Sequence, residues 1–334
     1  LTLKRADLVV TETDPFLLAF VGRWLQWWHG ARFVVYLQDI YPDVAVAVGK
    51  LREGWISRAL RWLLFSVYRK ADAVVVLSRD MERTCRAYGI AEDRLRIIPN
   101  WADTATLRPQ KQQNIFRQEH GLQNSFVVMY SGNMGLAHSL TPILDAAATL
   151  SDQPVSFALV GDGARRAALV AEAQARGLTN VRFFPYQPRE HLAQSLSAAN
   201  VHLISMQPEA SGLLMPSKLY GILASGSAVI ALADPTSELA ELIQRHELGF
   251  VCDPRDVDGG AERLAYVINF LAQNPAEVQM LGENARRLAE SEFDRSIQTA
   301  RFAAMLHELL QSAPVTQSAP TTVPVADAAQ PEGV

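Results

Sequence analysis

The segment SGLLMPSKLYGILASG, residues 211–226, gives the clearest local indication of the fold in this 334-residue chain. Pro216 suits the first turn of a helix, because that turn leaves its amide hydrogens unbonded, and Gly226 suits the helix end. Two short apolar runs, Val201–Ile204 and Ala228–Ala231, lie on either side. A strand, a helix and a second strand in this order predict a βαβ unit with parallel strands.

The same alternation extends along the chain in two series, which the polar stretch 102–124 separates. The first series predicts strands at Ala6–Val10, Phe33–Leu37, Ala73–Leu77 and Leu95–Ile98 and helices at Pro15–Trp28, Ile56–Arg69 and Asp80–Ala87. The second adds strands at Phe126–Tyr130, Val155–Val160 and Val181–Phe184 and helices at Ser139–Leu150, Ala164–Arg176, Arg189–Ala198, Ser217–Ala224 and Ser237–Arg245. We therefore predict the α/β class, with two Rossmann-like parallel sheets that face each other across a ligand-binding cleft.

The domain organisation follows from these two series. We expect residues 1–108 to form a partial N-terminal domain and residues 109–290 a second, complete one. Residues 291–312 are expected to be a helix that packs toward the first domain. Residues 313–334, rich in Pro, Ala and Thr, are expected to be a disordered tail. Leu1 leads at once into an apolar strand, so we expect the chain to begin inside a domain.

Charge and tryptophan are distributed unevenly along the chain. The first 100 residues carry 15 Lys and Arg against 11 Asp and Glu, although the whole chain has a net charge of -4, and all six tryptophans lie within residues 1–101. The overall charge gives no indication of nucleic-acid binding. Cys85 and Cys252 are far apart, which predicts neither a disulfide framework nor a zinc site and favours a reducing compartment. No apolar run is long enough for a membrane span, and no signal peptide is evident.

Several strand ends carry residues that suit anion binding. Gly132-Asn133 follows one predicted strand and Gly161-Asp162-Gly163 another, although each is also compatible with an ordinary tight turn. Ser217 and Lys218 open the helix described first, where backbone amides and the lysine can hold a diphosphate; a simple capped helix with a solvated lysine is the alternative. The GxGxxG fingerprint of dinucleotide-binding domains is absent, which argues against a dehydrogenase.

The first series has its own polar cluster and an aromatic helix. Gln38, Asp39, Tyr41, Pro42 and Asp43 follow the strand Phe33–Leu37, where carboxylates suit hydroxyl recognition or base chemistry, with a helix cap as the alternative. The helix around residues 56–69 mixes aromatic and basic side chains, among them Arg58, Arg61 and Trp62. It suits either a membrane interface with anionic lipid or a core helix with a basic solvent face.

Taken together, these residues resemble glycosyltransferase family 4, and most of all its colanic-acid fucosyltransferase-like exopolysaccharide enzymes. The matching pieces occur in family order and are Gln38–Asp43 with Ala45–Gly49, Tyr68–Ser78, Ile98–Trp101, Tyr130–Leu136, Gly161–Gly163, Pro216–Gly226 and Glu238. The resemblance implies a two-domain GT-B fold that lacks about half of its N-terminal domain here.

The resemblance also implies an activity. A retaining enzyme would move a sugar from a nucleoside diphosphate sugar to a hydroxyl of a growing, lipid-linked or polymeric glycan, without a metal or other cofactor. The C-terminal domain would bind the donor, with Lys218 and Asp39 in the catalytic roles. The implied donor-site residues are Gly132, Asn133, His138, Gly161, Asp162, Gly163, Tyr186, Gln187, Ser211, Gly212, Leu213, Leu214, Pro216, Ser217, Lys218 and Glu238.

The N-terminal domain would face the acceptor and an anionic membrane. The residues expected on that side are Gln38, Tyr41, Pro42, Asp43, Arg58, Arg61 and Trp62. The expected location is the cytoplasm, at the inner face of a bacterial cytoplasmic membrane.

The chain departs from the family pattern at several of these positions. Leu213 and Gly221 stand where two glutamates are usual, Asn133 and His138 where Arg and Lys are usual, and Gln38 where His is usual. Two alternatives therefore stay open. One is a sugar-nucleotide epimerase of the same architecture, although the shortage of acidic residues near Leu213–Gly221 counts against it; the other is a non-catalytic glycan- or partner-binding module.

Overall fold

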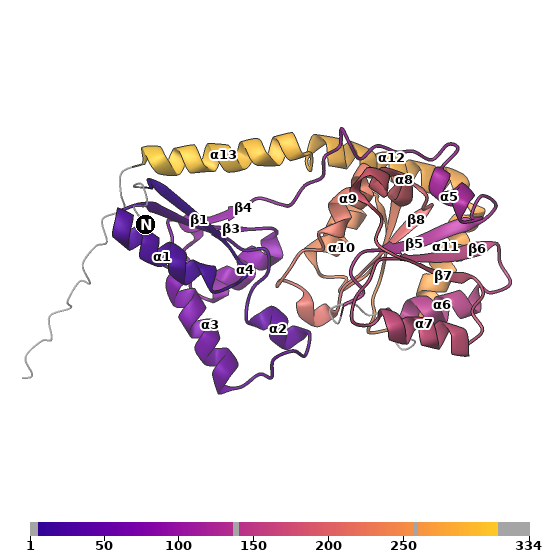
Figure 1. Cartoon of the computed structure of the whole chain (residues 1–334), viewed down its shortest axis with the longest axis horizontal. Coiled ribbons are helices and arrows are strands. Elements are labelled where there is room, and N and C mark those ends of the chain that lie inside the picture. The colour runs from indigo at the N-terminus through magenta and orange to yellow at the C-terminus, as the bar shows by residue number, and fades with distance from the viewer. Residues whose placement is uncertain (1–5, 136–139, 257–259, 313–334) are drawn as a thin grey trace, which may run out of the picture.

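A computed structural model describes residues 6–135, 140–256 and 260–312 as two α/β domains side by side (Figure 1). The first domain holds a four-stranded parallel sheet in the order β1-β2-β3-β4. Its elements are β1 (Leu8–Glu12), α1 (Leu18–His29), β2 (Arg32–Tyr36), α2 (Asp43–Ala47), α3 (Trp55–Tyr68), β3 (Ala73–Val76), α4 (Arg79–Ala87), η1 (Glu92–Arg94) and β4 (Leu95–Ile97).

The second domain holds a six-stranded parallel sheet in the order β10-β9-β8-β5-β6-β7. If β5 is counted as strand 1 of this domain, the order is 6-5-4-1-2-3, which is the doubly wound order of Rossmann-like domains. The strands are β5 (Phe126–Ser131), β6 (Val155–Val160), β7 (Val181–Phe184), β8 (Val201–Ser205), β9 (Ala228–Leu232) and β10 (Gly249–Cys252). The helices are α5 (Ile115–Glu119), α6 (Thr141–Thr149), α7 (Arg166–Ala175), η2 (Arg189–His191), α8 (Leu192–Ser197), η3 (Pro208–Ala210), α9 (Lys218–Ala224), α10 (Glu238–Arg245), α11 (Ala261–Gln273) and α12 (Pro275–Ser291).

The predicted fold class, two parallel sheets in two domains, is confirmed. The continuously apolar strands are buried on both faces; every residue of β3, β8 and β9 is buried. The sequence prediction missed α2, α5 and β10. The two helices have only five residues each, and β10 has four residues that begin with Gly249, a weak strand former.

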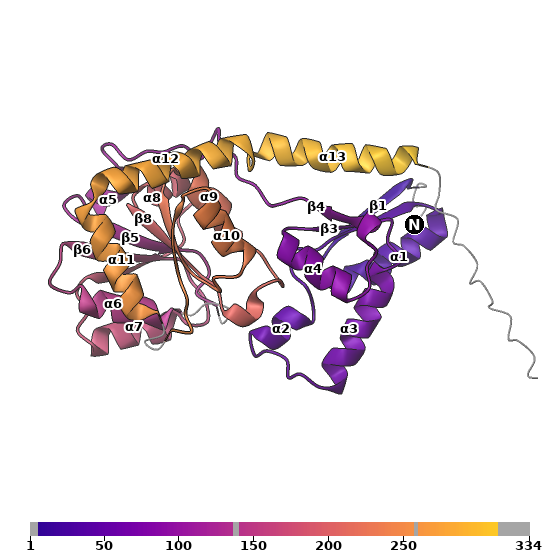
Figure 2. The ribbon, with the colours of Figure 1, turned by 180° about the vertical axis from the view of Figure 1, so that it is seen from behind.

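The last helix, α13 (Arg295–Gln311), leaves the second domain and lies along the first (Figures 1 and 2). Phe302 stacks on Tyr36 of β2 with ring centroids 5.6 Å apart, and Met305 belongs to the core of the first domain. Asp294 caps α13 through Ser296 and accepts a hydrogen bond from Thr104 in the interdomain linker. The chain therefore crosses between the domains twice, and the two crossings are tied together at Asp294.

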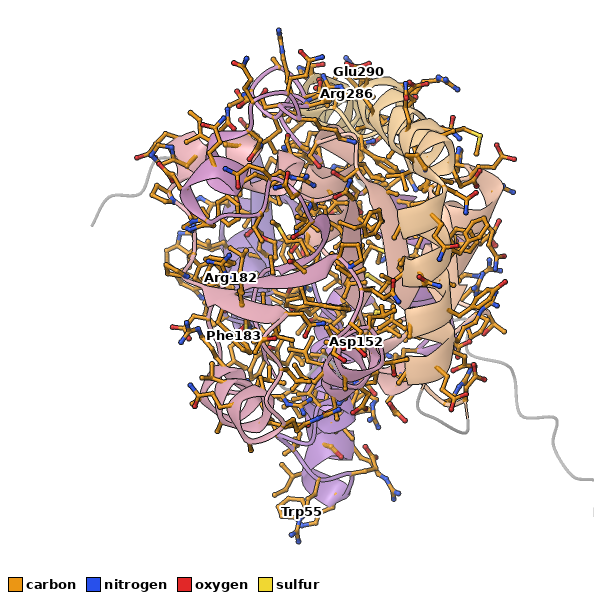
Figure 3. All side chains as sticks on the ribbon, turned by 90° about the vertical axis from the view of Figure 1, so that its right-hand side faces the viewer. Trp55, Asp152, Arg182, Phe183, Arg286 and Glu290 are labelled. Atoms are coloured by element: carbon orange, nitrogen blue, oxygen red, sulfur yellow. The ribbon has the colours of Figure 1, made fainter. Side chains whose placement is uncertain are left out.

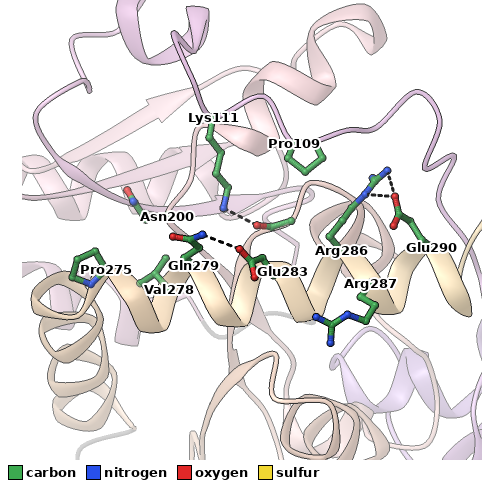
Figure 4. Close-up of a pocket in the computed structure, with 12 residues that line it drawn as sticks. Pro109, Lys111, Asn200, Pro275, Val278, Gln279, Glu283, Arg286, Arg287 and Glu290 are labelled. Atoms are coloured by element: carbon green, nitrogen blue, oxygen red, sulfur yellow. Dashed lines mark hydrogen bonds and ion pairs between the residues drawn. The ribbon is translucent and has the colours of Figure 1, made fainter.

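Arg286 on α12 fixes the linker to the second domain; Figure 4 shows its place on this helix, where it also pairs with Glu290. Its guanidinium donates to the backbone oxygens of Thr104 and Leu107 in the linker and of Ala224 at the end of α9, at 2.6–2.9 Å. Lys111 donates to the Gly226 oxygen at 2.7 Å, just beyond the same helix. Cations at the carboxyl end of α9 satisfy its last carbonyls and favour its dipole.

A reciprocal pair of carboxylates joins the two domains beside the cleft. The Glu238 carboxylate accepts hydrogen bonds from the backbone amides of Arg79 and Asp80 at the start of α4. In return, the Asp80 carboxylate accepts a 2.7 Å bond from the Glu238 amide at the start of α10. Each helix thus presents its amino end to the acid of the other, which the helix dipoles favour. We call Asp80 and Glu238 the carboxylate clamp.

The clamp makes a stability prediction. Glu238→Gln should lower the free energy of unfolding by about 1–3 kcal/mol at pH 7, because a charged acceptor of backbone amides is lost from a contact largely shielded from water. Urea denaturation measures this change. Glu241→Gln is the matched control: Glu241 contacts the same Arg79 but is half-exposed, so we expect a change under about 1 kcal/mol. Equal effects of the two substitutions would contradict a special role for the clamp.

Candidate functional site

A cavity lies between the domains at the point where the strand order of the second sheet reverses. The reversal falls between β5 and β8, and ligands of such sheets bind outside the carboxyl ends of these strands. The cavity has a volume of about 490 Å³. Its lining residues are Asp39, Ser131, Gly132, Asn133, Tyr186, Leu192, Leu196, Leu214, Met215, Pro216, Ser217, Lys218, Gly221 and Ile222. Asp39 comes from the first domain and all the others from the second.

Lys218, the first residue of α9, carries the most unusual group of the site. Its ammonium nitrogen is buried and has no hydrogen-bond partner among the residues that the structure describes, although part of the residue remains accessible. The nitrogen lies 3.8 Å from the centre of the Tyr130 ring, a cation–π contact. Burial lowers the pKa of Lys218 to about 7. An ammonium group without acceptors at a cavity wall is suited to an anionic ligand that supplies them.

Glycine turns make room for this lysine. Gly132 has a φ of 142°, and a Cβ there would approach the Lys218 Nζ to 3.2 Å. A Cβ on Gly161 would lie 2.1 Å from the Gly132 oxygen, and one on Gly163 would lie 2.4 Å from the Asn133 side chain. Gly161 and Gly163 therefore allow the turns after β5 and β6 to pack against each other, while Gly132 and Asn133 line the cavity itself.

Asp39 stands on the opposite wall, just after β2. Its backbone pairs with Leu214 in an isolated antiparallel bridge, and the amide of Ile40 donates to the Leu213 oxygen at 2.8 Å. The Thr13 hydroxyl accepts the amides of Gln38 and Asp39, at 3.0 and 3.4 Å. Burial, assisted by the negative charge of Asp14, raises the pKa of Asp39. The bridge thus holds a carboxyl of one domain against the loop that precedes α9 in the other.

The remaining predicted residues of the first domain have partners within that domain. Gln38 accepts a 2.9 Å hydrogen bond from Asn100, and the Tyr41 ring stacks on Phe16. The peptide bond between Tyr41 and Pro42 is cis. Asp43 is buried and accepts bonds from Arg61 and Tyr88, both at 2.8 Å. Arg61 also pairs with Glu53 and is only 20% exposed. Arg58 and Trp62 are exposed, with accessible fractions of 74% and 68%.

The structure also places several predicted donor-side residues. Glu238 belongs to the carboxylate clamp and does not line the cavity. Gly212 accepts a hydrogen bond from Thr84, and Leu213 packs against the core of the first domain, so the segment from Ser211 joins the domains. The Gln187 amide donates to the Pro185 oxygen, and the Asp162 carboxylate accepts the Gly163 amide. His138 lies outside the described residues.

Sequence reasoning missed part of the site. Tyr130, which belongs to the family match Tyr130–Leu136, was not expected to place its ring beneath the Lys218 ammonium. Leu192 and Leu196 belong to no motif, and Met215 and Ile222 lie within the segment 211–226 without an expected role; the fold brings all four to the cavity. They give the site an apolar floor beneath its few polar groups, as in most small-molecule sites.

Comparison with known proteins identifies the family. Residues 112–288 match the family "Glycosyl transferases group 1", and residues 1–101 match "Glycosyl transferase 4-like domain". The chain belongs to the group 1 glycosyltransferases. Since both domains match families of this activity, this chain is a glycosyltransferase, and its resemblance to family 4 is confirmed.

Two relatives are named as glycosyltransferases, and the name of one of them refers to colanic acid biosynthesis. The chain is 26% identical over 314 residues to a probable glycosyltransferase, WbjE, of Pseudomonas aeruginosa, covering 93% of this chain and 77% of that one. It is 30% identical over 270 residues to WcaI of Escherichia coli, a putative colanic acid biosynthesis glycosyl transferase, covering 77% and 66% of the two chains.

Solved structures of other glycosyltransferases share the fold. HepE of Anabaena in complex with UDP and glucose superposes with a TM-score of 0.73 at 20% identity, over 90% of this chain and 78% of that one. Sucrose-phosphate synthase of Thermosynechococcus elongatus superposes with a TM-score of 0.73 at 21% identity, over 91% and 73%. The GT-B architecture predicted from sequence is therefore confirmed.

The buried ammonium of this glycosyltransferase makes a stability prediction. Lys218→Met should stabilise the protein relative to wild type, and more so at pH 6 than at pH 9, by about 2–3 kcal/mol. Because the pKa of Lys218 is lowered in the folded protein, its amine is protonated in the unfolded chain but largely neutral in the folded protein between about pH 7 and 10. Wild-type stability therefore falls as the pH drops from about 10 toward 7.

Urea denaturation of both proteins at the two pH values measures this difference. Lys50→Met serves as the control, since Lys50 lies on the exposed turn after α2 and should show no such pH dependence. If the stability difference between Lys218→Met and wild type is equal at pH 6 and pH 9, the pKa of Lys218 is not lowered by burial.

Proposed function

We propose that this glycosyltransferase transfers a sugar from a nucleoside diphosphate sugar to a hydroxyl of a growing, lipid-linked polysaccharide, with retention of anomeric configuration. The observation that carries the proposal is the Lys218 ammonium, which lies at the wall of the interdomain cavity without an acceptor in the described part of the chain. A diphosphate supplies the missing oxygen acceptors and the balancing negative charge. HepE, with the same fold, has been solved with UDP and with UDP-glucose, which supports a nucleotide-sugar donor here.

The donor occupies the second-domain side of the cavity in this proposal. Its diphosphate lies against Lys218 and the backbone where α9 begins, and its base and ribose lie toward Tyr186 and the turns after β5 and β6. As the bond between the anomeric carbon and the diphosphate oxygen breaks, negative charge grows on the leaving group. Lys218, whose protonated form the nearby diphosphate favours, stabilises that charge, usually the largest single contribution that such a site makes to catalysis. The proposal assigns this role to the lysine and requires no metal ion.

The acceptor enters from the first domain. A hydroxyl of the glycan approaches the anomeric carbon beside Asp39, whose carboxyl orients it by hydrogen bonding. A new carbon–oxygen bond forms as the old one breaks, and the hydroxyl proton passes to the departing diphosphate. The bridge between Asp39 and Leu214 fixes the orienting group against the donor loop, which is the alignment that a two-substrate reaction needs.

We place the acceptor on a lipid at an anionic membrane, at the inner face of a bacterial cytoplasmic membrane. The similarity to WcaI, a putative colanic acid biosynthesis glycosyl transferase, and the basic character of residues 1–100 support this setting. No helix of the described residues combines the length and the hydrophobicity that crossing a bilayer requires. Arg61 is occupied by two carboxylates, so contact with lipid would fall to residues such as Arg58 and Trp62.

One observation favours a second candidate, a glycan-binding protein without turnover. Leu213 is packed in the first-domain core and Gly221 lines the cavity, so neither position offers the carboxylate that the family pattern has there. Among the lining residues that the structure describes, Asp39 is the one acid. This shortage also argues against an epimerase, which needs acid and base groups around the sugar.

Donor binding is tested by thermal shift with UDP, GDP and their sugars. A nucleotide that binds only the folded protein raises its melting temperature. We expect at least one of them to do so, and Lys218→Ala to weaken its affinity about tenfold or more through the lost charged contact. Arg245→Ala, an exposed site on α10, is the control that should bind like wild type. Unchanged affinity in Lys218→Ala would remove the lysine from the donor site.

Turnover is tested at Asp39. Asp39→Asn keeps the size of the side chain but removes its charge, so we expect turnover to fall about tenfold or more while donor affinity stays constant. Release of nucleoside diphosphate in the presence of a lipid-linked glycan acceptor measures turnover. Wild-type turnover in Asp39→Asn would exclude Asp39 from the mechanism. Donor binding without any turnover in the wild-type protein would favour the glycan-binding candidate.

A further inference from the structure

The first domain exposes most of the tryptophan of the chain. Trp24, Trp27, Trp28, Trp55 and Trp62 have accessible fractions of 50%, 71%, 64%, 79% and 68%. All five lie on α1 and α3. Single exposed apolar residues are normal on soluble proteins, but a contiguous group of large ones marks an interaction surface. Its partner can be inferred from where these side chains point and from the charges around them.

On α1 the exposed side chains point away from the sheet. Ala19 and Gly22 are buried, and Gly22 lies so close to β2 that a Cβ there would stand 2.3 Å from the Phe33 ring. Leu17, Val21, Trp24 and Trp28 recur at intervals of four, three and four residues, which places them on one face of the helix. At 100° per residue this face is opposite the one that Ala19 and Gly22 turn to the sheet.

The same holds for α3, which packs against α1. Ser57, Leu64 and Tyr68 are fully buried against the core. Trp55 and Trp62, seven residues apart, lie on the opposite face, flanked by Ile56 and Leu63. Trp55 projects from the end of α3 in Figure 3. We call these outward side chains the tryptophan face, and its members are Leu17, Val21, Trp24, Trp27, Trp28, Trp55, Ile56, Trp62 and Leu63.

α1 packs on β1 and β2 of the first sheet and against α3 beside it. The tryptophan face lies on the outside of the helix layer, where a three-layer α/β domain meets its surroundings.

Positive charge accompanies the indole rings. Arg58 is 74% exposed and lies between Trp55 and Trp62 on α3, and Lys70 is exposed just beyond the helix end. Glu53, just before α3, pairs with both Arg58 and Arg61. Indole rings beside exposed cations are suited to the headgroup region of a bilayer, where the ring meets the acyl boundary and the cation meets anionic phosphate.

We propose that the tryptophan face is the surface by which this protein docks on an anionic lipid bilayer, with α1 and α3 lying in the interface side by side. This inference rests on the membrane setting of the proposed function and names the contact within it. Since α2 lies between α3 and the loop at η3 that borders the cleft, docking brings the first-domain side of the cavity toward the lipid surface. A lipid-linked acceptor could then reach Asp39 without leaving the bilayer.

The test is vesicle binding by the whole chain. We expect co-sedimentation with vesicles that contain phosphatidylglycerol, a shift of tryptophan fluorescence to shorter wavelength, and weakening as salt is raised. The double variant Trp24→Ser/Trp28→Ser and the single variant Trp62→Ser should each bind about tenfold more weakly or worse. Tyr266→Ser, a 64% exposed aromatic on α11 of the second domain, is the matched control and should bind like wild type.

Several outcomes would overturn the inference: no binding by wild type, equal binding to neutral phosphatidylcholine vesicles, or tryptophan variants that bind unchanged. If the wild type self-associates without binding vesicles, and these variants abolish the self-association, the tryptophan face instead binds a second copy of the chain. The nucleotide-induced rise in melting temperature is measured on the same variants and should persist. If nucleotide raises the melting temperature of wild type but the protein does not bind vesicles, only the docking surface is refuted. If nucleotide leaves the melting temperature of wild type unchanged, only the donor site is refuted.

Discussion

The arrangement of the cleft in this glycosyltransferase depends on one buried amine, that of Lys218. Lys218 keeps its nitrogen over the Tyr130 ring and away from any acceptor, although desolvating a charged group is costly unless something pairs with it. The neighbouring glycines follow from this requirement, since Gly132 must leave space for the lysine and Gly161 must let the next turn approach. A ligand that supplies acceptors to this amine therefore gains binding free energy, because it offsets a desolvation cost that is already present in the folded protein.

The second domain supplies most of the residues of this site, and the first domain completes it. The donor-side loop between η3 and α9 is held by Ile40, Asp39 and Thr84 of the first domain, so its shape depends on the contact between domains. The carboxylate clamp fastens the same boundary at the amino ends of α4 and α10. At the far end of α9, Arg286 and Lys111 hold its last carbonyls. The short helix that carries Lys218 is thus secured at both ends.

The sequence was sufficient for the fold because its strands are unbroken apolar runs and its helices have clear ends. It pointed to Asp39 and Gly132 through their places at strand ends, where parallel sheets bind ligands, and to Lys218 through its place at the start of a helix. It was less informative where function depends on tertiary pairing. Glu238 was expected at the donor, but its carboxylate meets the amides of α4, a contact between residues about 160 positions apart that no local pattern encodes. Likewise Asp43 and Arg61, both expected at the acceptor side, neutralise each other.

The long final helix has a consequence for how the protein is made. Phe302 and Met305 supply part of the core around β2, so the domain that emerges first from the ribosome cannot close its hydrophobic interior until the chain has been translated past residue 305. Pairing across so long a stretch of sequence is slow, and the half-finished domain exposes apolar surface in the meantime. Nascent chains of this enzyme should therefore engage chaperones through the first sheet, while the second domain, whose strands and covering helices are consecutive in sequence, completes its folding independently.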